Sequence, residues 1–122
     1  MAYLARQEQN KPVLIGEIAE NQQISQKFLE AILLELKKSG FLGSKKGKGG
    51  GYYLRKPSDE ISIAAVIRVL DGPIAWLPCV SLNYYEKCED CASEETCELN
   101  RLMIRVRDNI LDIVEKNTIE DL

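Results

Sequence analysis

Residues 24–52 of the chain, ISQKFLEAILLELKKSGFLGSKKGKGGGY, contain the strongest signals for secondary structure in this sequence. Ser25 is expected to cap a helix by accepting hydrogen bonds from the backbone N–H groups of its first turn. That helix runs to about Ser39, and Gly40 ends it because glycine readily adopts the left-handed conformation found there. Its apolar residues recur at helical spacing and predict a buried stripe: Phe28, Leu29, Ile32, Leu33 and Leu36.

A shorter helix is expected immediately before this one. Apolar residues at helical spacing predict a helix over residues 14–21, residues 21–23 form the turn, and a further short helical stretch covers residues 2–9. Two short helices joined by a tight turn are typical of a helix-turn-helix, in which residues near the start of the second helix, here Gln26 and Lys27, reach base edges. An ordinary helical hairpin has the same pattern, so the helix pair alone does not distinguish it from a DNA-binding helix-turn-helix.

The stretch that follows favours the helix-turn-helix. Residues 41–46 and 52–54 predict two strands, and the glycine-rich residues 47–51 between them permit positive φ and close approach to another surface. A loop that cradles a nucleotide phosphate is the alternative, but neither GxxxxGK[ST] nor GxGxxG before a helix is present. A β-hairpin in this place is typical of a winged helix. Its lysines suit a phosphate-rich partner: Lys45, Lys46 and Lys48.

The charges are distributed unevenly along the chain. The net charge is −3, which argues against a nucleic-acid partner, but residues 1–56 carry ten basic and five acidic side chains. Residues 57–85 carry one basic and three acidic side chains, and residues 86–122 carry five basic and eleven acidic ones. Such asymmetry predicts one part that binds a polyanion and another part that does not.

The length and composition restrict the class of protein. The chain has 122 residues, of which 45% are apolar, which suits one compact domain with an appended element. No apolar run approaches the roughly 20 residues that a membrane span needs. The first ten residues lack the layout of a secretory signal, so we expect a cytoplasmic protein.

The C-terminal half predicts a helix over residues 61–70 and a long helix over residues 94–117. Apolar residues on the long helix alternate at four and three residues, which is typical of a helix–helix seam. The seam packs either on its own domain or on a second copy. We favour dimerisation, because helix-turn-helix proteins bind two half-sites through two-fold symmetry. The expected interface residues are Leu99, Met103, Val106, Ile110 and Ile113.

Four cysteines with the spacing C-x8-C-x2-C-x5-C precede the long helix, and the chain has no histidine. The pair Cys88 and Cys91 is spaced to share a metal, and Cys97 lies at a helix start, where the helix dipole favours a thiolate. From the spacing, zinc and an iron–sulfur cluster are equally open, and disulfides are a third option. Cys79 follows Pro78 and is either a fourth ligand or a small buried residue; we favour the latter.

Several stretches together match the pattern of a known family. Residues 46–52 contain a G-x-x-G-G-Y signature, and residues 69–74 end a helix with Asp-Gly-Pro. Similar matches cover residues 18–20, 24–30, 36–42, 59–62 and 118–122. Through these motifs, which span essentially the whole chain, the sequence resembles the Rrf-two (Rrf2) family of bacterial winged-helix transcription regulators.

The resemblance implies a homodimer with a winged-helix head and a long C-terminal dimerisation helix. It implies that residues 25–28 enter the major groove of double-stranded DNA and that the wing reaches the minor groove. It also implies that Cys88, Cys91 and Cys97 hold an iron–sulfur cluster. The DNA-binding residues expected on this basis are Ser25, Gln26, Lys27, Phe28, Lys45, Lys46, Lys48, Gly49, Gly50 and Tyr52.

The sequence departs from the family pattern in three places. Members have a longer first helix with a basic segment before it, so we expect a shortened first helix here. Gln23 stands where glycine is usual and is expected to carry backbone strain. Lys46 stands where arginine is common, which keeps the charge but loses the planar guanidinium fork.

The expected fold is mainly α with a small β-hairpin. Residues 1–72 form a winged helix-turn-helix, residues 73–97 a linker and cysteine loop, and residues 98–122 a dimerisation helix and tail. The expected function is transcriptional regulation that senses redox, iron–sulfur or nitrosative status through a cluster. The alternatives are a regulator without a cluster that responds to a metabolite or protein, and a zinc-stapled protein-interaction module. No enzyme is expected, because no nucleophile-and-base pair is evident.

Overall fold

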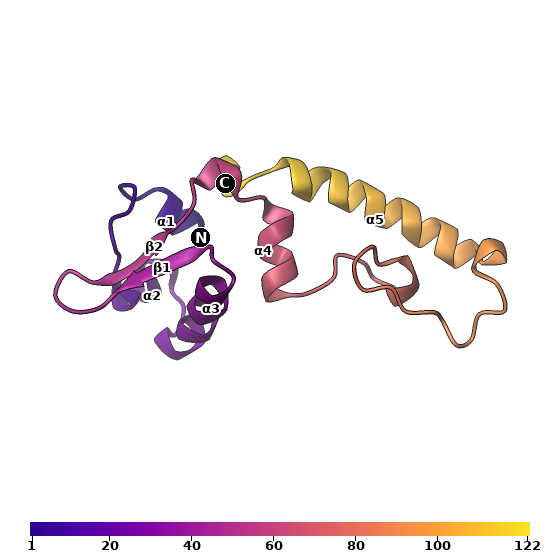
Figure 1. Ribbon diagram of the computed structural model, residues 1–122, viewed down its shortest axis with the longest axis horizontal. Helices are drawn as coiled ribbons and strands as arrows, with labels where there is room; N and C mark the ends of the chain where they lie inside the picture. The colour runs from indigo at the N-terminus through magenta and orange to yellow at the C-terminus, as the bar shows by residue number, and fades with distance from the viewer.

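The computed structural model describes residues 1–122, and the chain is mainly helical with one two-stranded antiparallel sheet, as predicted. Figure 1 shows a head built from the N-terminal elements and a long C-terminal helix that extends away from it. None of the helices combines the length and apolar character needed to cross a membrane. The elements are α1 (Ala2–Ala5), α2 (Ile15–Gln22), α3 (Gln26–Lys38), β1 (Leu42–Lys45), β2 (Gly51–Leu54), α4 (Ile63–Leu70) and α5 (Glu98–Lys116), with short 3-10 turns η1 (Ser58–Glu60), η2 (Pro78–Val80), η3 (Glu94–Thr96) and η4 (Ile119–Asp121).

α2 and α3 form the predicted helix-turn-helix. Gln23 ends α2 with φ 52° and ψ 42°, in the left-handed region that residues with a side chain rarely adopt, which confirms the strain expected there. Ser25 then begins α3 as its N-cap, and its hydroxyl accepts a hydrogen bond from the backbone N–H of Phe28 at 3.3 Å. At the other end of α3, Gly40 adopts the positive φ of 81° that its C-terminal position favours.

One hydrophobic core joins the first three helices and the hairpin to two later positions, Ile61 and Ile119. α3 contributes a buried row at i, i+4 and i+7, namely Leu29, Leu33 and Leu36, with Ile32 half-buried beside it. The prediction that Phe28 belongs to this stripe is wrong, because its side chain is 62% exposed. Phe28 precedes the buried row by one residue and lies in the first turn of the helix, so it turns towards solvent.

α1 is shorter than the helix predicted over residues 2–9, although its Leu4 is buried in the core. Residues 6–11 contain no apolar side chain that would anchor a further turn. Asn10 adopts a positive φ of 62°, and the residue before Pro12 is disfavoured in a helical conformation. These local preferences end the helix early.

The wing is an antiparallel hairpin with Leu42 opposite Leu54 and Lys45 opposite Gly51, close to the predicted strands. It is tied to the segment before α2, where Val13 and Tyr52 exchange two backbone hydrogen bonds of 2.8 Å each. The hairpin is therefore an integral part of the head rather than a free arm.

A Cβ added to Gly43 or Gly51 of the hairpin would meet other atoms of the head, and those atoms would have to shift. A Cβ on Gly43 would lie 2.4 Å from the Tyr53 ring. A Cβ on Gly51, where φ is 143°, would lie 2.2 Å from the carbonyl oxygen of Val13. The sequence predicts that the glycines let the backbone approach another surface, and for Gly51 that surface is the chain's own segment before α2.

The end of the chain returns to the head. The backbone N–H of Ile119 donates to the carbonyl oxygen of Ile61 at 2.9 Å, which places η4 against the core. α4 packs along α5, and Arg68 pairs with Glu115 at 2.7 Å. α5 therefore starts far from the head and ends beside it (Figure 1).

Candidate nucleic-acid interface and cysteine cavity

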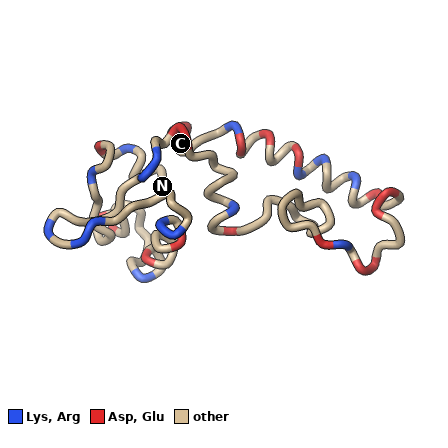
Figure 2. Tube along the Cα trace, in the orientation of Figure 1, with Lys and Arg blue, Asp and Glu red and all other residues tan.

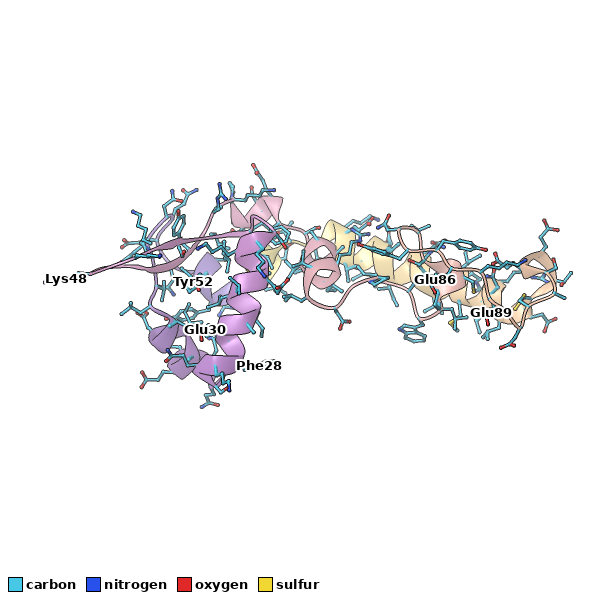
Figure 3. The ribbon with its side chains drawn as sticks, turned by 60° about the horizontal axis from the view of Figure 1, so that its bottom comes forward. Phe28, Glu30, Lys48, Tyr52, Glu86 and Glu89 are labelled. Atoms are coloured by element: carbon cyan, nitrogen blue, oxygen red, sulfur yellow. The ribbon has the colours of Figure 1, made fainter.

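The first turn of α3 presents the predicted DNA-binding side chains at the surface. Gln26 and Lys27 are exposed, and Phe28 is labelled at the end of α3 in Figure 3. Ser25 is exposed too, but its hydroxyl is engaged in capping the helix. A partner that enters at this end of α3 meets one cation, one amide and one aromatic ring.

The hairpin carries the predicted lysines Lys45, Lys46 and Lys48 on its exposed part, with Lys48 at the tip (Figure 3). Figure 2 shows these basic residues along the hairpin, while acidic residues gather at the other end of the molecule, on the cysteine loop and the start of α5. The charge asymmetry of the sequence is therefore also an asymmetry in space, and it favours a polyanion at the head.

Three further predicted residues of the wing differ in their surroundings. Gly49 is exposed with φ 75°. Gly50 is buried in the turn, where a Cβ would lie 2.4 Å from the carbonyl oxygen of Lys45, and Tyr52 is half-buried against the core. Gly50 and Tyr52 thus have a role in the structure of the head, whatever they contact outside it.

All four cysteines line a single cavity of about 290 Å³ between η2, the cysteine loop and the start of α5. Cys79 lies in η2, Cys88 and Cys91 lie in the loop, and Cys97 is the N-cap of α5. Beside the cavity, the Tyr85 hydroxyl donates to Glu94, one of the lining residues, at 2.5 Å. The remaining lining residues include Leu77, Pro78, Glu86, Leu99 and Asn100.

Hydrogen bonds fix the backbone around the cysteines. The backbone N–H of Cys91 donates to the carbonyl oxygen of Cys88 at 3.4 Å, which closes a turn. The Sγ of Cys97 accepts from the backbone N–H of Asn100 at 3.4 Å. Partial burial raises the pKa of the Cys91 thiol, the neighbouring Cys97 and Cys88 raise it further, and a backbone hydrogen bond at Ser93 lowers it. The free thiol of Cys91 therefore favours its protonated form.

The donor set fits an iron–sulfur cluster. No three of these side chains converge closely enough, as they stand, to hold a single metal ion. An iron–sulfur cluster has several metal atoms, so its ligands surround a volume rather than a point, and thiolates are the side chains that hold it. The chain supplies four thiols around one cavity and no imidazole.

The predicted seam of α5 is only partly covered by its own chain. α5 packs on α4 and η2 through a neighbouring row that includes Asn100, Arg107 and Leu111. The seam residues Leu99 and Ile113 are 54% and 62% exposed. Between them, Met103, Val106 and Ile110 are half-buried. An apolar strip thus remains available along the helix.

Sequence reasoning missed two polar residues of α5 that organise the cavity. Asn100 is buried and donates from its side-chain nitrogen to the Sγ of Cys79 at 3.5 Å. Arg107 is largely buried and donates to the carbonyl oxygen of Val80 at 2.6 Å. The only available signal was the position of Asn100 three residues after Cys97, on the same helix face.

A helix-turn-helix followed by a two-stranded wing defines the winged-helix class of DNA-binding regulators. The family model described as "Rrf2: Iron-dependent Transcriptional regulator" matches residues 1–122. The chain belongs to the Rrf2 family of transcriptional regulators. The relatives that it matches, which include IscR and CymR, are transcriptional regulators and not enzymes.

Three comparisons show how similar the relatives are. The rrf2-like HTH-type transcriptional regulator of Rhodobacter capsulatus is 38% identical, over 97% of this chain and 79% of its own length. The HTH-type transcriptional regulator IscR of Pectobacterium carotovorum is 31% identical, over 100% of this chain and 71% of its own length. The solved structure of CymR, the global cysteine regulator of B. subtilis, is similar with a TM-score of 0.78 and 31% identity, over 98% of this chain and 84% of that one.

Proposed function

We propose that this regulator binds operator DNA as a homodimer through α3 and the wing, and that an iron–sulfur cluster in the cysteine cavity adjusts that binding to redox, iron–sulfur or nitrosative status. The observation that carries the proposal is the single cavity lined by all four thiols at the start of α5. Cys88, Cys91 and Cys97 are the proposed ligands. When bound, a cluster supplies a redox-active metal centre that reacts with oxidants.

The DNA-binding part of the proposal assigns different roles to the two elements of the head. The first turn of α3 exposes Gln26, Lys27 and Phe28. The N-terminal part of a recognition helix is the part that meets base edges. The lysines of the hairpin contact phosphates, which adds affinity without sequence preference. The basic head and the acidic cysteine loop lie at opposite ends of the molecule, so DNA approaches only the head (Figure 2).

The cavity and the head communicate through α5 in this proposal. The cysteine loop does not lie beside the wing in space; it lies at the far end of α5 (Figure 1). α5 connects Cys97 at one end to the segment that contacts Ile61 at the other. Loading or loss of the cluster changes how the loop and η2 rest on α5. In a dimer joined through α5, such a change alters the spacing of the two recognition helices.

The experiment that tests the cluster compares wild type with a Cys88/Cys91/Cys97→Ala triple variant, both prepared anaerobically. Wild type is expected to contain iron and sulfide and to absorb visible light, and the variant is expected to contain neither. Affinity for a DNA site selected by wild type from a random library is expected to differ between the two by about 5- to 150-fold, the range of ordinary coupling between sites. A Ser93/Thr96→Ala variant, changed in the same loop, is the matched control.

Three results contradict parts of the proposal. Colourless wild-type protein with stoichiometric zinc would assign the cavity to a structural metal. Equal DNA affinity of the triple variant and loaded wild type would remove the switch. Protein without any metal whose DNA binding responds to a small molecule would favour the second candidate, a regulator without a cluster. The similarity to CymR, described as a global cysteine regulator, supports that candidate.

The proposed dimer interface on α5 can be tested separately from the cluster. A Val106/Ile113→Asp double variant is expected to weaken self-association at least about 100-fold, because each buried aliphatic side chain contributes roughly 1.5–3 kcal/mol and the charge would be buried unpaired. Sedimentation velocity over a concentration series measures the change. A Leu14/Leu34→Asp variant, which changes exposed apolar residues of the head instead, is expected to associate as wild type does. Wild type that sediments as a monomer at micromolar concentration would contradict the interface.

A further inference from the structure

We propose that Cys79 is the fourth thiolate ligand of the cluster and that Asn100 positions it. The inference rests on the proposed function and adds a residue that the sequence pattern favours as merely buried. It starts from the cavity, which Cys79 lines together with Cys88, Cys91 and Cys97. Iron–sulfur clusters are commonly held by four cysteines, so three thiolates leave one ligand to be supplied.

Cys79 is held firmly against α5. Its turn, η2, is bound to α5 by Arg107, which donates to the carbonyl oxygen of Val80 at 2.6 Å. The side chain of Val80 is buried at the same contact. On the other side, the backbone N–H of Glu86 donates to the carbonyl oxygen of Pro78 at 3.2 Å, which draws the cysteine loop back to η2. The position of Cys79 is thus set by contacts on both sides of it.

Asn100 contacts two of the sulfur atoms. Its backbone N–H donates to the Sγ of Cys97 at 3.4 Å and its side-chain nitrogen donates to the Sγ of Cys79 at 3.5 Å. Asn100 is only 5% exposed, so an amide placed there without a partner would carry a desolvation penalty. N–H donors favour sulfur in its anionic, ligating form. One buried residue therefore brings Cys79 and Cys97 towards the same metal group.

The competing donors in the cavity are carboxylates. Glu94 already accepts a hydrogen bond from the Tyr85 hydroxyl. Glu86 is exposed at the rim. Soft thiolate is preferred over carboxylate by iron–sulfur clusters, so Cys79 is the better fourth ligand. When Cys79 binds iron, the thiol proton is released to solvent and the sulfur lone pair forms the new bond.

The ligand set then has two halves. Cys79 and Cys97 belong to η2 and the start of α5, which are hydrogen-bonded to each other, whereas Cys88 and Cys91 belong to the loop. A cluster held by both halves ties the loop to the helix. With Cys97 as the only ligand on the helix side, that tie would depend on a single bond.

The test uses the full chain, reconstituted anaerobically with ferrous iron and sulfide. Cys79→Ala is expected to release iron to a chelator at least about 10-fold faster than wild type, since loss of even an outer-shell partner commonly costs 10- to 100-fold. Cys79→Ser keeps the size of the side chain and is expected to shift the charge-transfer absorbance, because oxygen replaces sulfur. Glu86→Ala, changed in the same cavity, is expected to match wild type in iron content, absorbance and release rate.

Asn100 has a separate readout, since it acts on the ligands and does not itself bind iron. Asn100→Leu is expected to retain iron and to shift the midpoint potential of the cluster to a more negative value, because hydrogen bonds to the sulfurs stabilise the reduced, more negative state. Far-UV circular dichroism of each variant verifies the helical content.

The outcomes separate the two proposals. If wild type takes up no iron and sulfide, the proposed function and this inference both fail. If wild type is loaded and both Cys79 variants share its absorbance, iron content and release rate, Cys79 is not a ligand and the cluster proposal stands. If Glu86→Ala releases iron faster and the Cys79 variants do not, the fourth ligand is the carboxylate. An unchanged potential in Asn100→Leu overturns the role of Asn100.

Discussion

Replacing Lys45, Lys46 and Lys48 together by alanine is expected to reduce DNA affinity by about 100-fold or more at moderate salt. Each exposed lysine that neutralises a phosphate releases a counterion, so its removal weakens binding to every sequence. The slope of log affinity against log salt is expected to fall by about 2 to 3 per protomer, since each contact contributes roughly 0.9. Fluorescence anisotropy with a labelled duplex over a salt series measures both effects.

A matched variant separates a local wing contact from a general loss of charge. Lys87, Arg101 and Arg105 lie on the cysteine loop and α5, away from the hairpin, and replacing these three by alanine removes the same charge. This variant is expected to bind within about 3-fold of wild type, because charges more than a Debye length from the phosphates are screened. Equal losses in the two triple variants would show that the hairpin does not contact DNA.

Gly51→Ala is expected to destabilise the head by at least about 3 kcal/mol. The Cβ would lie 2.2 Å from the carbonyl oxygen of Val13 and 2.8 Å from the backbone nitrogen of Leu14, and both are backbone atoms that a rotamer change does not move. The φ of 143° is in addition a conformation that alanine disfavours. The variant must therefore break the hydrogen bonds between Val13 and Tyr52. Urea unfolding followed by circular dichroism measures the cost.

Gly49→Ala is the control, because Gly49 also has a positive φ, of 75°, but nothing lies within 4 Å of the added Cβ. Its cost is expected to be about 1–2 kcal/mol, the price of the left-handed conformation alone. If the free energy of unfolding falls equally in the two variants, the close approach of Gly51 to Val13 does not contribute to the cost of the Gly51 substitution. The pair therefore isolates the contact that joins the wing to the rest of the head.

The head was largely predictable because its signals are local. The cap at Ser25, the glycine at Gly40 and the apolar period between them each act within a few residues, and the observed α3 differs from the predicted helix by a residue at its end. Phe28 was misassigned because periodicity states which residues share a face but not where the covering element ends. α1 is shorter than predicted because the polar residues 6–9 that would continue it have no apolar side chain to pack in the core.

That Cys88, Cys91 and Cys97 lie near one another was predictable from the sequence, whereas the contacts that place Cys79 beside them were not. The spacing of Cys88, Cys91 and Cys97 is local, and it predicts a shared metal group or disulfides. The place of Cys79 depends on η2 lying against α5, through contacts between residues that are 21 and 27 positions apart in the chain. No local pattern marks Asn100 or Arg107 as the residues that make those contacts.

Chemistry that acts over one or two turns of chain was therefore present in the amino-acid order: the helix-turn-helix, the basic wing, the long apolar seam and the thiol set. Packing between distant segments determined the remainder. It turned Phe28 outwards and placed Gly51 against Val13. It also brought Cys79 into the same cavity as the other three thiols. These positions result from which surfaces exclude water together, a property of the whole folded chain rather than of any short stretch.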